Sequence, residues 1–263
     1  MDVSVVLVVH NQLALTRACL SSLGRTTLPF ELCVVDNGST DGTQAFFEGG
    51  SPMPVRYQRN AGNDGLISAL NQGARLASRE YLCFIHNDTE MHEPAWLARL
   101  RSAVVEGDDV GLAGLYGARR VRRDGRYAGR TLVHCLEGQG TLAAPVVEVA
   151  AVDGVCLFLG RSLYDSVGGF DEGYGFFHGY DRELSFAVRA AGRRCVVVNA
   201  PFLHRGGGTR TAERAPRRPA EDLAERRQAL ARFSAKWAHR LPSDVRSLRE
   251  RMADRLAPLW PRG

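Results

Sequence analysis

The sequence is poor in lysine and contains no close pair of cysteines. Lys236 is the only lysine among 263 residues, so the positive charge rests almost entirely on arginine. The six cysteines show no C-x-x-C spacing, and several lie in apolar runs, where a thiol packs as a small hydrophobe. We interpret them as reduced structural residues, which excludes a zinc site or a disulfide framework built on cysteine. They are Cys19, Cys33, Cys83, Cys135, Cys156 and Cys195.

Long apolar runs and targeting signals are also missing. No run approaches the roughly 18 apolar residues of a membrane span. A charged Asp2 followed by the strand-like VSVVLVV is not a secretory signal, so we expect a cytoplasmic protein. No internal repeat or low-complexity segment stands out. With 44% hydrophobic residues, the chain can fill the core of one large α/β domain or of two small ones.

The net charge of +5 is concentrated in the last part of the chain. Residues 1–204 contain 19 basic and 22 acidic side chains, whereas residues 205–263 contain 15 and 7, so the two parts carry −3 and +8. A basic tail of this kind could contact nucleic acid, an anionic membrane surface or a phosphorylated substrate. It could also be a solvated helix face, because the apolar spacing from Leu223 to Leu241 is that of an amphipathic helix.

Strand-like and helical patterns alternate four times in about the first 105 residues. Val3 to Val9 is a nearly continuous β-branched run, as expected of a central strand that is covered on both faces. The alternation predicts an α/β fold with a doubly wound parallel sheet. The predicted strands are residues 3–9, 31–35, 55–58, 81–85, 111–114, 149–159 and 195–198.

Polar residues directly follow three of these strands. The run at 81–85 ends in HNDTE, the run at 31–35 ends in DNGSTDG, and the run at 3–9 ends in His10-Asn11. Ligands of open α/β sheets bind beyond the carboxyl ends of the strands, so these residues are candidates for a binding site. Ordinary turns are the alternative, because Asn and Asp are common turn residues.

Three features bear on the kind of ligand. Asp36 directly follows a strand, where a carboxylate can accept hydrogen bonds from a ribose or a base edge. Gly62 and Gly65 could bring backbone amides near a phosphate, although most loops with this spacing are only turns. The first strand is not followed by G-x-G-x-x-G, which argues against a dinucleotide oxidoreductase. Further along, a glycine-rich aromatic loop leads into a helix that we expect to begin near Asp181.

Taken in order, these motifs resemble glycosyltransferase family 2, the inverting, metal-dependent sugar transferases with the GT-A fold. The resemblance covers Val3 to about His204. Within the family, the layout of the motifs is similar to that of bacterial rhamnosyltransferase-like and polysaccharide-assembly enzymes. The motifs are VVLVVHN, VVDNGSTDGT, RNAGNDGLISALNQGARLA, FIHNDTEM, GGFDEGYGFFHGYDRELSFAVRAAGRRCVVV and FLH. The implied organisation is a GT-A domain at 1–212, with a nucleotide-binding half at 1–115 and an acceptor and catalytic half at 116–212, and a basic helical extension at 213–263.

The resemblance implies a site of three parts. Asp88 falls at the metal-binding carboxylate of the family's D-x-D-like signature, and His204 matches the histidine that often completes the metal site. Asp181 falls at the catalytic base, and Glu183 represents the second acid of the family's E-D-x-D helix start. The implied nucleotide-binding positions are Val9, His10 and Asn11 beside the nucleobase, Asp36 on the base or ribose, Asn60, Gly62 and Gly65 in the nucleotide pocket, and Asn87 next to the metal carboxylate.

The implied cofactor is Mn²⁺ or Mg²⁺, and the implied donor is a nucleoside diphosphate sugar. A divalent ion neutralises the charge that develops on a diphosphate leaving group, and a carboxylate with an imidazole favours Mn²⁺ slightly. Asp181 at a helix start is kept ionised by the amides that it faces, as a base requires. The acceptor would be a saccharide, a lipid-linked molecule or a small molecule. For the basic tail we expect peripheral contact with the inner face of an anionic membrane, or packing of its helix on the domain with Trp237 buried.

The sequence departs from the family pattern at three positions. His10 stands where a hydroxyl or aromatic residue is common, and Asn87 replaces an acid often found in the metal signature. Tyr180 stands where the family usually has Glu just before the base. The last change bears on acceptor contacts more than on the base itself.

Other interpretations remain open. Asp181 could be only a helix cap, His204 a surface histidine and Asp36 a turn residue. The glycine-rich loop after His204 could be a lid that brings Arg205 or Arg210 to the diphosphate, or it could be disordered. For the whole chain, the alternatives are a sugar-nucleotide-binding scaffold without activity and a nucleotidyltransferase.

Overall fold

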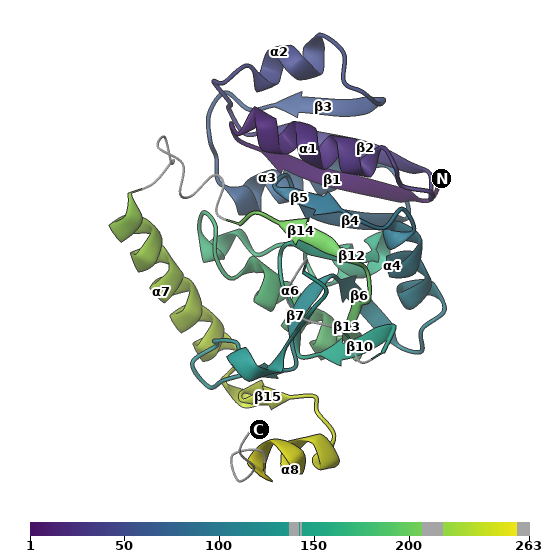
Figure 1. Ribbon diagram of the computed structural model, residues 1–263. Coiled ribbons are helices and arrows are strands. Elements are labelled where there is room, and N and C mark those ends of the chain that lie inside the picture. Colours follow the sequence, from purple (N-terminus) through teal and green to yellow (C-terminus); the bar gives the residue numbers. More distant parts are fainter. Residues whose placement is uncertain (137–141, 143, 207–217, 257–263) are drawn as a thin grey trace, which may run out of the picture.

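The computed structural model describes residues 1–136, 142, 144–206 and 218–256. At its centre an eight-stranded sheet has the order β10-β13-β6-β12-β4-β1-β2-β3 (Figure 1). Its strands are β1 (Val3–Val9), β2 (Phe30–Asp36), β3 (Val55–Arg59), β4 (Tyr81–His86), β6 (Val110–Gly114), β10 (Val146–Val149), β12 (Cys156–Gly160) and β13 (Arg194–Val198). All are parallel except β12, which is antiparallel to β4 and β6, and β10, which is antiparallel to β13. The predicted mostly parallel sheet is confirmed.

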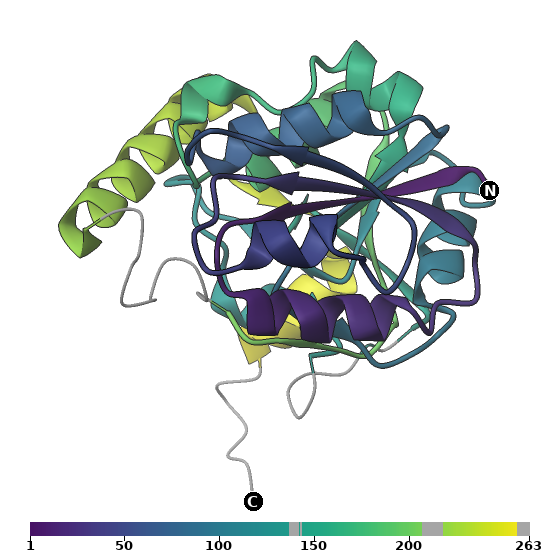
Figure 2. The same cartoon turned by 90° about the horizontal axis from the view of Figure 1, so that it is seen from above.

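Helices cover both faces of this sheet, as Figure 2 shows. The α-helices in the described part of the chain are α1 (Leu13–Leu23), α2 (Thr43–Glu48), α3 (Leu66–Leu76), α4 (Trp96–Val105), α5 (Arg161–Ser166), α6 (Tyr180–Ala190), α7 (Pro219–Lys236) and α8 (Leu248–Leu256). Side chains alternate along β1, so that Val6 packs into the core on the α3 side and Val5 into the core on the α1 and α4 side. Gly73 lets α3 approach the sheet closely, because a Cβ there would lie 2.3 Å from Cγ1 of Val6.

Short strands outside the central sheet bring distant segments to the end of β4. β5 (Thr89–Met91) pairs antiparallel with β14 (Phe202–His204), and His204 lies opposite Thr89. Residue 204 is thereby held beside the polar residues that follow β4. The remaining short elements are β7 (Tyr116–Ala118), β8 (Arg120–Val121), β9 (Leu132–His134), β11 (Ala151–Val152), β15 (Ser243–Asp244) and the 3₁₀ segments η1 (Gly129–Thr131), η2 (Glu172–Tyr174) and η3 (Ala238–Arg240).

The strand-like run predicted at residues 149–159 is divided among three strands. β10 ends at Val149, β11 follows, and β12 then enters the central sheet between β4 and β6. The interruption falls at Asp153-Gly154, where Oδ1 of Asp153 accepts a hydrogen bond from the backbone N of Val155 at 3.2 Å. A local turn therefore overrides the apolar pattern on either side of it.

The C-terminal segment packs on the rest of the protein (Figure 1). Phe233 of α7 is fully buried, and Trp237 is 8% exposed. The ring of Phe186 on α6 lies 4.8 Å from the ring of Phe233 and 5.6 Å from that of Trp237. Packing of the helix with Trp237 buried is thus what the structure shows. The predicted boundary between residues 212 and 213 lies outside the described residues.

None of the helices in the described ranges has the length and apolar character needed to cross a membrane.

Candidate active site

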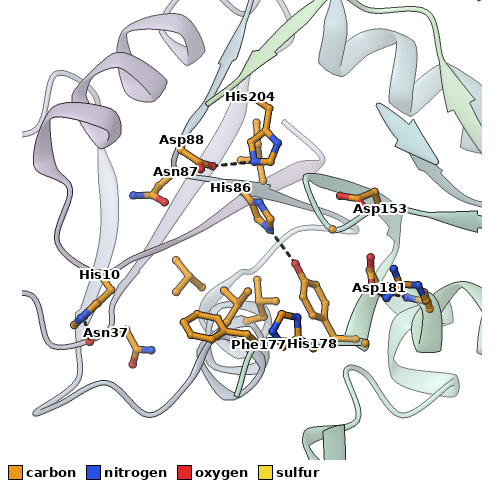
Figure 3. A pocket seen from close by; sticks show the side chains of 18 of the residues that line it. His10, Asn37, His86, Asn87, Asp88, Asp153, Phe177, His178, Asp181 and His204 are labelled. Atoms are coloured by element: carbon orange, nitrogen blue, oxygen red, sulfur yellow. Dashed lines mark hydrogen bonds and ion pairs between the residues drawn. The ribbon is translucent and has the colours of Figure 1, made fainter. Parts of the chain in front are cut away.

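A cavity of about 340 Å³ lies at the carboxyl ends of β1 and β4 and at the amino-terminal ends of α3 and α6. This volume is within the usual range for small-molecule sites. Figure 3 shows His10 and Asn37 at one end of the cavity, Asp181 toward the other end, and the side chains that follow β4 between them. The site residues predicted from the sequence that line the cavity are His10, Asn87, Asp88, Asp181 and His204. Residues from both predicted halves of the domain therefore share one pocket.

Three side chains that can bind a metal converge at the end of β4. One ligand atom each from His86, Asp88 and His204 lies within 4.8 Å of the other two. Nε2 of His204 is 3.2 Å from Oδ1 of Asp88. Burial raises the pKa of Asp88, but the hydrogen bond with His204 and the charge of His86 outweigh it and hold this pKa at about 2. An ionised carboxylate with two imidazoles fits a first-row divalent ion such as Mn²⁺ better than it fits Mg²⁺.

His86 is a ligand candidate that was not predicted from the sequence, where it stands only within the polar run that follows the strand. β4 ends at His86, and a turn follows at residues 87 and 88. Nδ2 of Asn87 donates to Oγ1 of Thr16 on α1 at 3.0 Å, and Figure 3 shows this amide turned away from His204. The two-residue spacing of His86 and Asp88 at a strand end was the available signal.

Asp181 lies in the first turn of α6 and is 8% exposed. Its Oδ1 accepts from the backbone N of Arg182 at 2.8 Å, and its Oδ2 accepts from the hydroxyl of Tyr127 at 3.3 Å. Gly179 occupies the N-cap position of α6, so Asp181 is not the N-cap residue of this helix. Its carboxylate accepts from one amide of the first turn and also lines the cavity.

A second carboxyl group, Asp153, lines the same cavity and was also missed. It follows β11 at the turn into β12 (Figure 3). Burial and then the negative charge of Asp181 raise the pKa of Asp153 to about 6. In the sequence, Asp153 reads as an ordinary turn residue, and no local pattern distinguishes it from one.

Tyr180 connects the cluster of His86, Asp88 and His204 to α6, the helix that carries Asp181. Its hydroxyl lies 2.9 Å from Nε2 of His86. Gly154 leaves the space for this contact, since a Cβ there would lie 2.1 Å from the hydroxyl oxygen of Tyr180. A phenol next to an imidazole thus occupies the place where the family pattern has a glutamate.

The other end of the cavity is lined by amide groups. Nδ1 of His10 lies 2.8 Å from the carbonyl oxygen of Asn37, and Nδ2 of Asn37 donates to Oδ1 of Asn63 at 2.8 Å. Nδ2 of Asn60, a residue that does not line the cavity, donates to Oδ1 of Asn37 at 3.0 Å. Such groups offer both donors and acceptors, as the edge of a nucleobase or a ribose requires.

The remaining nucleotide-binding positions predicted from the sequence do not line the cavity. They are Val9, Asn11, Asp36, Asn60, Gly62 and Gly65. Asp36 is fully buried and accepts from the backbone N of Ser39 at 2.8 Å and from the hydroxyl of Tyr57 at 2.7 Å. A Cβ on Gly38 would lie 2.6 Å from Cα of Gly62, so the two loops touch through glycine backbones. In this structure these residues hold the loops whose neighbouring side chains face the cavity.

The loop after His204, for which a lid and disorder were the two alternatives, lies only partly within the described residues. Arg205 forms an ion pair with Glu90 at 2.8 Å, and its side chain is 52% exposed. Arg205 does not line the cavity. Arg210 lies outside the described residues.

The sequence pattern described as "Glycosyl transferase family 2" matches residues 4–156, which is more than half of the chain. The chain belongs to this family, and the resemblance carried by its motifs is confirmed. The matched region includes β1 to β4, Asp88 and Asp153. It ends before α6 and α7.

Three relatives illustrate which proteins the chain is similar to. "Uncharacterized protein y4gI" of Sinorhizobium fredii is 32% identical over 257 residues, which is 89% of this chain and 27% of that protein. "O-antigen biosynthesis protein RfbC" of Myxococcus xanthus is 30% identical over 160 residues, which is 56% of this chain and 12% of that protein. "PGL/p-HBAD biosynthesis glycosyltransferase" of Mycobacterium bovis is 33% identical over 117 residues, which is 43% and 45% of the two chains. This chain thus spans less than half the length of these relatives.

Solved structures confirm the GT-A fold. GalNAc-T7, solved with UDP, GalNAc and Mn²⁺, superposes with a TM-score of 0.62 at 19% identity and covers 78% of this chain and 44% of its own. The mannosyltransferase PcManGT from Pyrobaculum calidifontis, solved with GDP-Man and Mn²⁺, gives 0.58 at 17% identity and covers 98% and 80% of the two chains.

Proposed function

We propose that the chain is the catalytic domain of a metal-dependent, inverting glycosyltransferase that moves a sugar from a nucleoside diphosphate sugar to an acceptor hydroxyl. The observation that carries the proposal is that one cavity holds both the cluster of His86, Asp88 and His204 and the carboxylate of Asp181. In this arrangement the leaving group and the attacking hydroxyl have separate protein groups on different walls of one pocket.

The nucleoside is proposed to bind at the end formed by His10, Asn37 and Asn63. Their ring and amide groups provide hydrogen bonds to the base and the ribose, while buried Asp36 fixes the loop through Ser39. The other predicted nucleotide positions that do not line the cavity are proposed to act in the same indirect way, by holding the loops. They are Val9, Asn11, Asn60, Gly62 and Gly65. The diphosphate then lies next to the end of β4.

Asp88, His86 and His204 are proposed to hold Mn²⁺ or Mg²⁺, with Mn²⁺ favoured by the two nitrogen donors. When bound, such an ion neutralises the charge that develops on the diphosphate as the glycosidic bond breaks. The low pKa of Asp88 keeps its carboxylate charged for this role. The relatives solved with Mn²⁺ support the choice of ion.

Asp181 is proposed to accept the proton of the acceptor hydroxyl as that oxygen attacks the anomeric carbon. The hydrogen bonds from Arg182 and Tyr127 fix the position of its carboxylate. Attack from the face opposite the leaving group, in a single displacement, inverts the anomeric centre. General-base assistance is typically worth ~10²- to 10⁴-fold in rate.

The acceptor is proposed to be a saccharide or a lipid-linked molecule in the assembly of bacterial surface polysaccharide or glycoconjugate. The names of RfbC and of the mycobacterial glycosyltransferase support this assignment. The proposal places the reaction in the cytoplasm, at the inner face of the membrane, with the arginine-rich residues after 205 near anionic lipid.

A panel of UDP-, GDP- and dTDP-sugars tests the proposal, with Mn²⁺ and Mg²⁺ as alternative ions. Donor hydrolysis and thermal stabilisation find the donor without knowledge of the acceptor. We expect metal-dependent hydrolysis or transfer that Asp181→Asn lowers by at least ~10²-fold while the affinity for the nucleoside diphosphate stays within about twofold. Binding without any turnover would indicate the scaffold instead, and undiminished transfer by Asp181→Asn would remove the assigned base.

A further inference from the structure

The loop between η2 and α6, residues 175–179, forms part of the cavity wall and is held by α7. The backbone N atoms of Phe176 and Phe177 both donate to Oε1 of Glu225, at 2.5 and 2.7 Å. From the other side, the backbone N of Leu66 donates to the carbonyl oxygen of Phe176 at 2.8 Å. The loop is thus clamped between the start of α3 and the C-terminal helix.

α7 also reaches the cavity with its side chains. Nε2 of His178 lies 2.9 Å from Oδ1 of Asp222, and the two side chains are only 13% and 25% exposed. Arg226, one turn further along α7, lines the cavity together with His178 and Phe177. The imidazole is therefore oriented by a carboxylate from a helix that lies beyond the matched family region.

This pairing decides what His178 presents to the cavity. A carboxylate only accepts hydrogen bonds, so Nε2 carries the proton that Asp222 receives. No hydrogen bond joins Nδ1 of His178 to any residue in the described ranges. The ring of Phe177 lies 6.4 Å away, centroid to centroid, on the same wall. An oriented ring nitrogen beside an aromatic ring suits a sugar, which has hydroxyl groups at its edge and C–H groups on its faces.

We propose that α7 completes a sugar subsite, in which Asp222 orients His178 and Nδ1 of His178 binds a hydroxyl of a sugar ring. The inference rests on the proposed function, because it names the groups that recognise the saccharide in the same cavity. The sugar is either the transferred residue or the accepting one, since both meet near Asp181. His178 is a binding residue, and Asp222 is a positioning residue that acts through it.

The test compares His178→Ala, Asp222→Ala and Asp222→Asn with the wild-type protein. An amide oxygen can still accept from Nε2, so Asp222→Asn is expected to behave like the wild type within about twofold. His178→Ala is expected to lose about tenfold in affinity or KM for the sugar, which corresponds to about 1.4 kcal/mol, and Asp222→Ala is expected to lose less. Arg227→Ala, an exposed change on α7 away from the cavity, serves as the control.

Two measurements distinguish whether the subsite binds the transferred sugar or the accepting sugar. The first measures the affinity of the nucleotide sugar found by the panel, relative to its nucleoside diphosphate. The second measures KM for methyl glycosides used as acceptors. A loss confined to the first measurement assigns the subsite to the transferred sugar, and a loss confined to the second assigns it to the acceptor.

Equal values in both measurements for His178→Ala and the wild type would overturn the inference. If His178→Ala fails to fold, the comparison of Asp222→Ala with Asp222→Asn decides in the same way, since only the first disturbs the imidazole. A wild-type protein that neither binds nor hydrolyses any nucleotide sugar would instead refute the proposed function. The two failures are therefore separable.

Discussion

The indole Nε1 of Trp237 donates a hydrogen bond to Oε2 of Glu183 at 2.8 Å, which ties the C-terminal segment to the first turn of α6. Glu183 also accepts from the hydroxyl of Tyr174 at 2.6 Å and from Lys236, the only lysine, at 2.5 Å. Glu183 is 4% exposed and does not line the cavity. The second acid of the helix-start motif is therefore an anchor for the helix that carries Asp181.

Trp237→Phe is expected to destabilise the protein by about 1–3 kcal/mol, because buried Glu183 loses a hydrogen-bond donor. The melting temperature should fall by roughly 2–4 °C for each kcal/mol lost at this chain length. Urea unfolding monitored by circular dichroism measures the effect, with Arg227→Ala as the exposed control. A Trp237→Phe protein as stable as the control would show that this hydrogen bond contributes nothing.

His86→Ala is expected to weaken Mn²⁺ binding at least about tenfold, because it removes one of three converging ligands. Arg227→Ala is the control, since this exposed residue of α7 does not line the cavity, and we expect its Mn²⁺ affinity to stay within about twofold. His86→Asp should shift the ion preference toward Mg²⁺, because it replaces nitrogen with oxygen. Calorimetric titration with each ion measures all three. A His86→Ala protein that binds Mn²⁺ like the control would exclude His86 from the site.

Gly154→Ala is expected to lower activity by more than about tenfold, because the new Cβ would lie 2.1 Å from the hydroxyl of Tyr180 and force it away from His86. Gly160→Ala provides the control, since nothing lies within 4 Å of a Cβ at that position. Tyr180→Phe separates the loss of the hydrogen bond from the steric effect. Full activity in both Gly154→Ala and Tyr180→Phe would mean that this contact has no part in the reaction.

Asp153 makes the stability of the metal-free protein depend on pH. Its pKa is raised from 3.8 to about 6 in the folded state, so the folded protein retains a proton that the unfolded chain releases between these values. The unfolding free energy therefore falls as pH rises through this window and stays reduced above it. Asp153→Asn removes the charge, and we expect its melting temperature to exceed that of the wild type by a few degrees at pH 8 and to match it near pH 4. Scanning calorimetry in EDTA measures both, and equal values at pH 8 would contradict the raised pKa.

Much of the fold follows from the sequence because the apolar patterns are strong. The β-branched run at Val3–Val9 and the alternation with amphipathic helices predict the sheet of β1 to β4 without ambiguity. The antiparallel entry of β12 between β4 and β6 was not predicted. The apolar residues of β12 suit a parallel or an antiparallel strand equally. The turn at Asp153 reverses the chain before β12.

The sequence predicts which strand ends form the candidate site more securely than it predicts which side chains line it. Asp88 and Asp181 were found from motifs, and the cavity includes both. His86 and Asp153 were missed, and Asp36 proved to be buried behind the cavity. The reason is physical: a polar loop can turn each carboxylate or amide either inward or outward, and the hydrogen bonds that decide this come from residues far away in the sequence.

The ribbon formed by β5 and β14 has a consequence for folding. It presents His204 to Asp88 although these residues lie in distant parts of the chain. The ion proposed for this site would join their side chains as a cross-link that exists only in the native state. Occupancy at a hundred times the dissociation constant adds about 2.7 kcal/mol to the stability. The divalent ion proposed for this site would therefore also protect the folded protein from proteolysis.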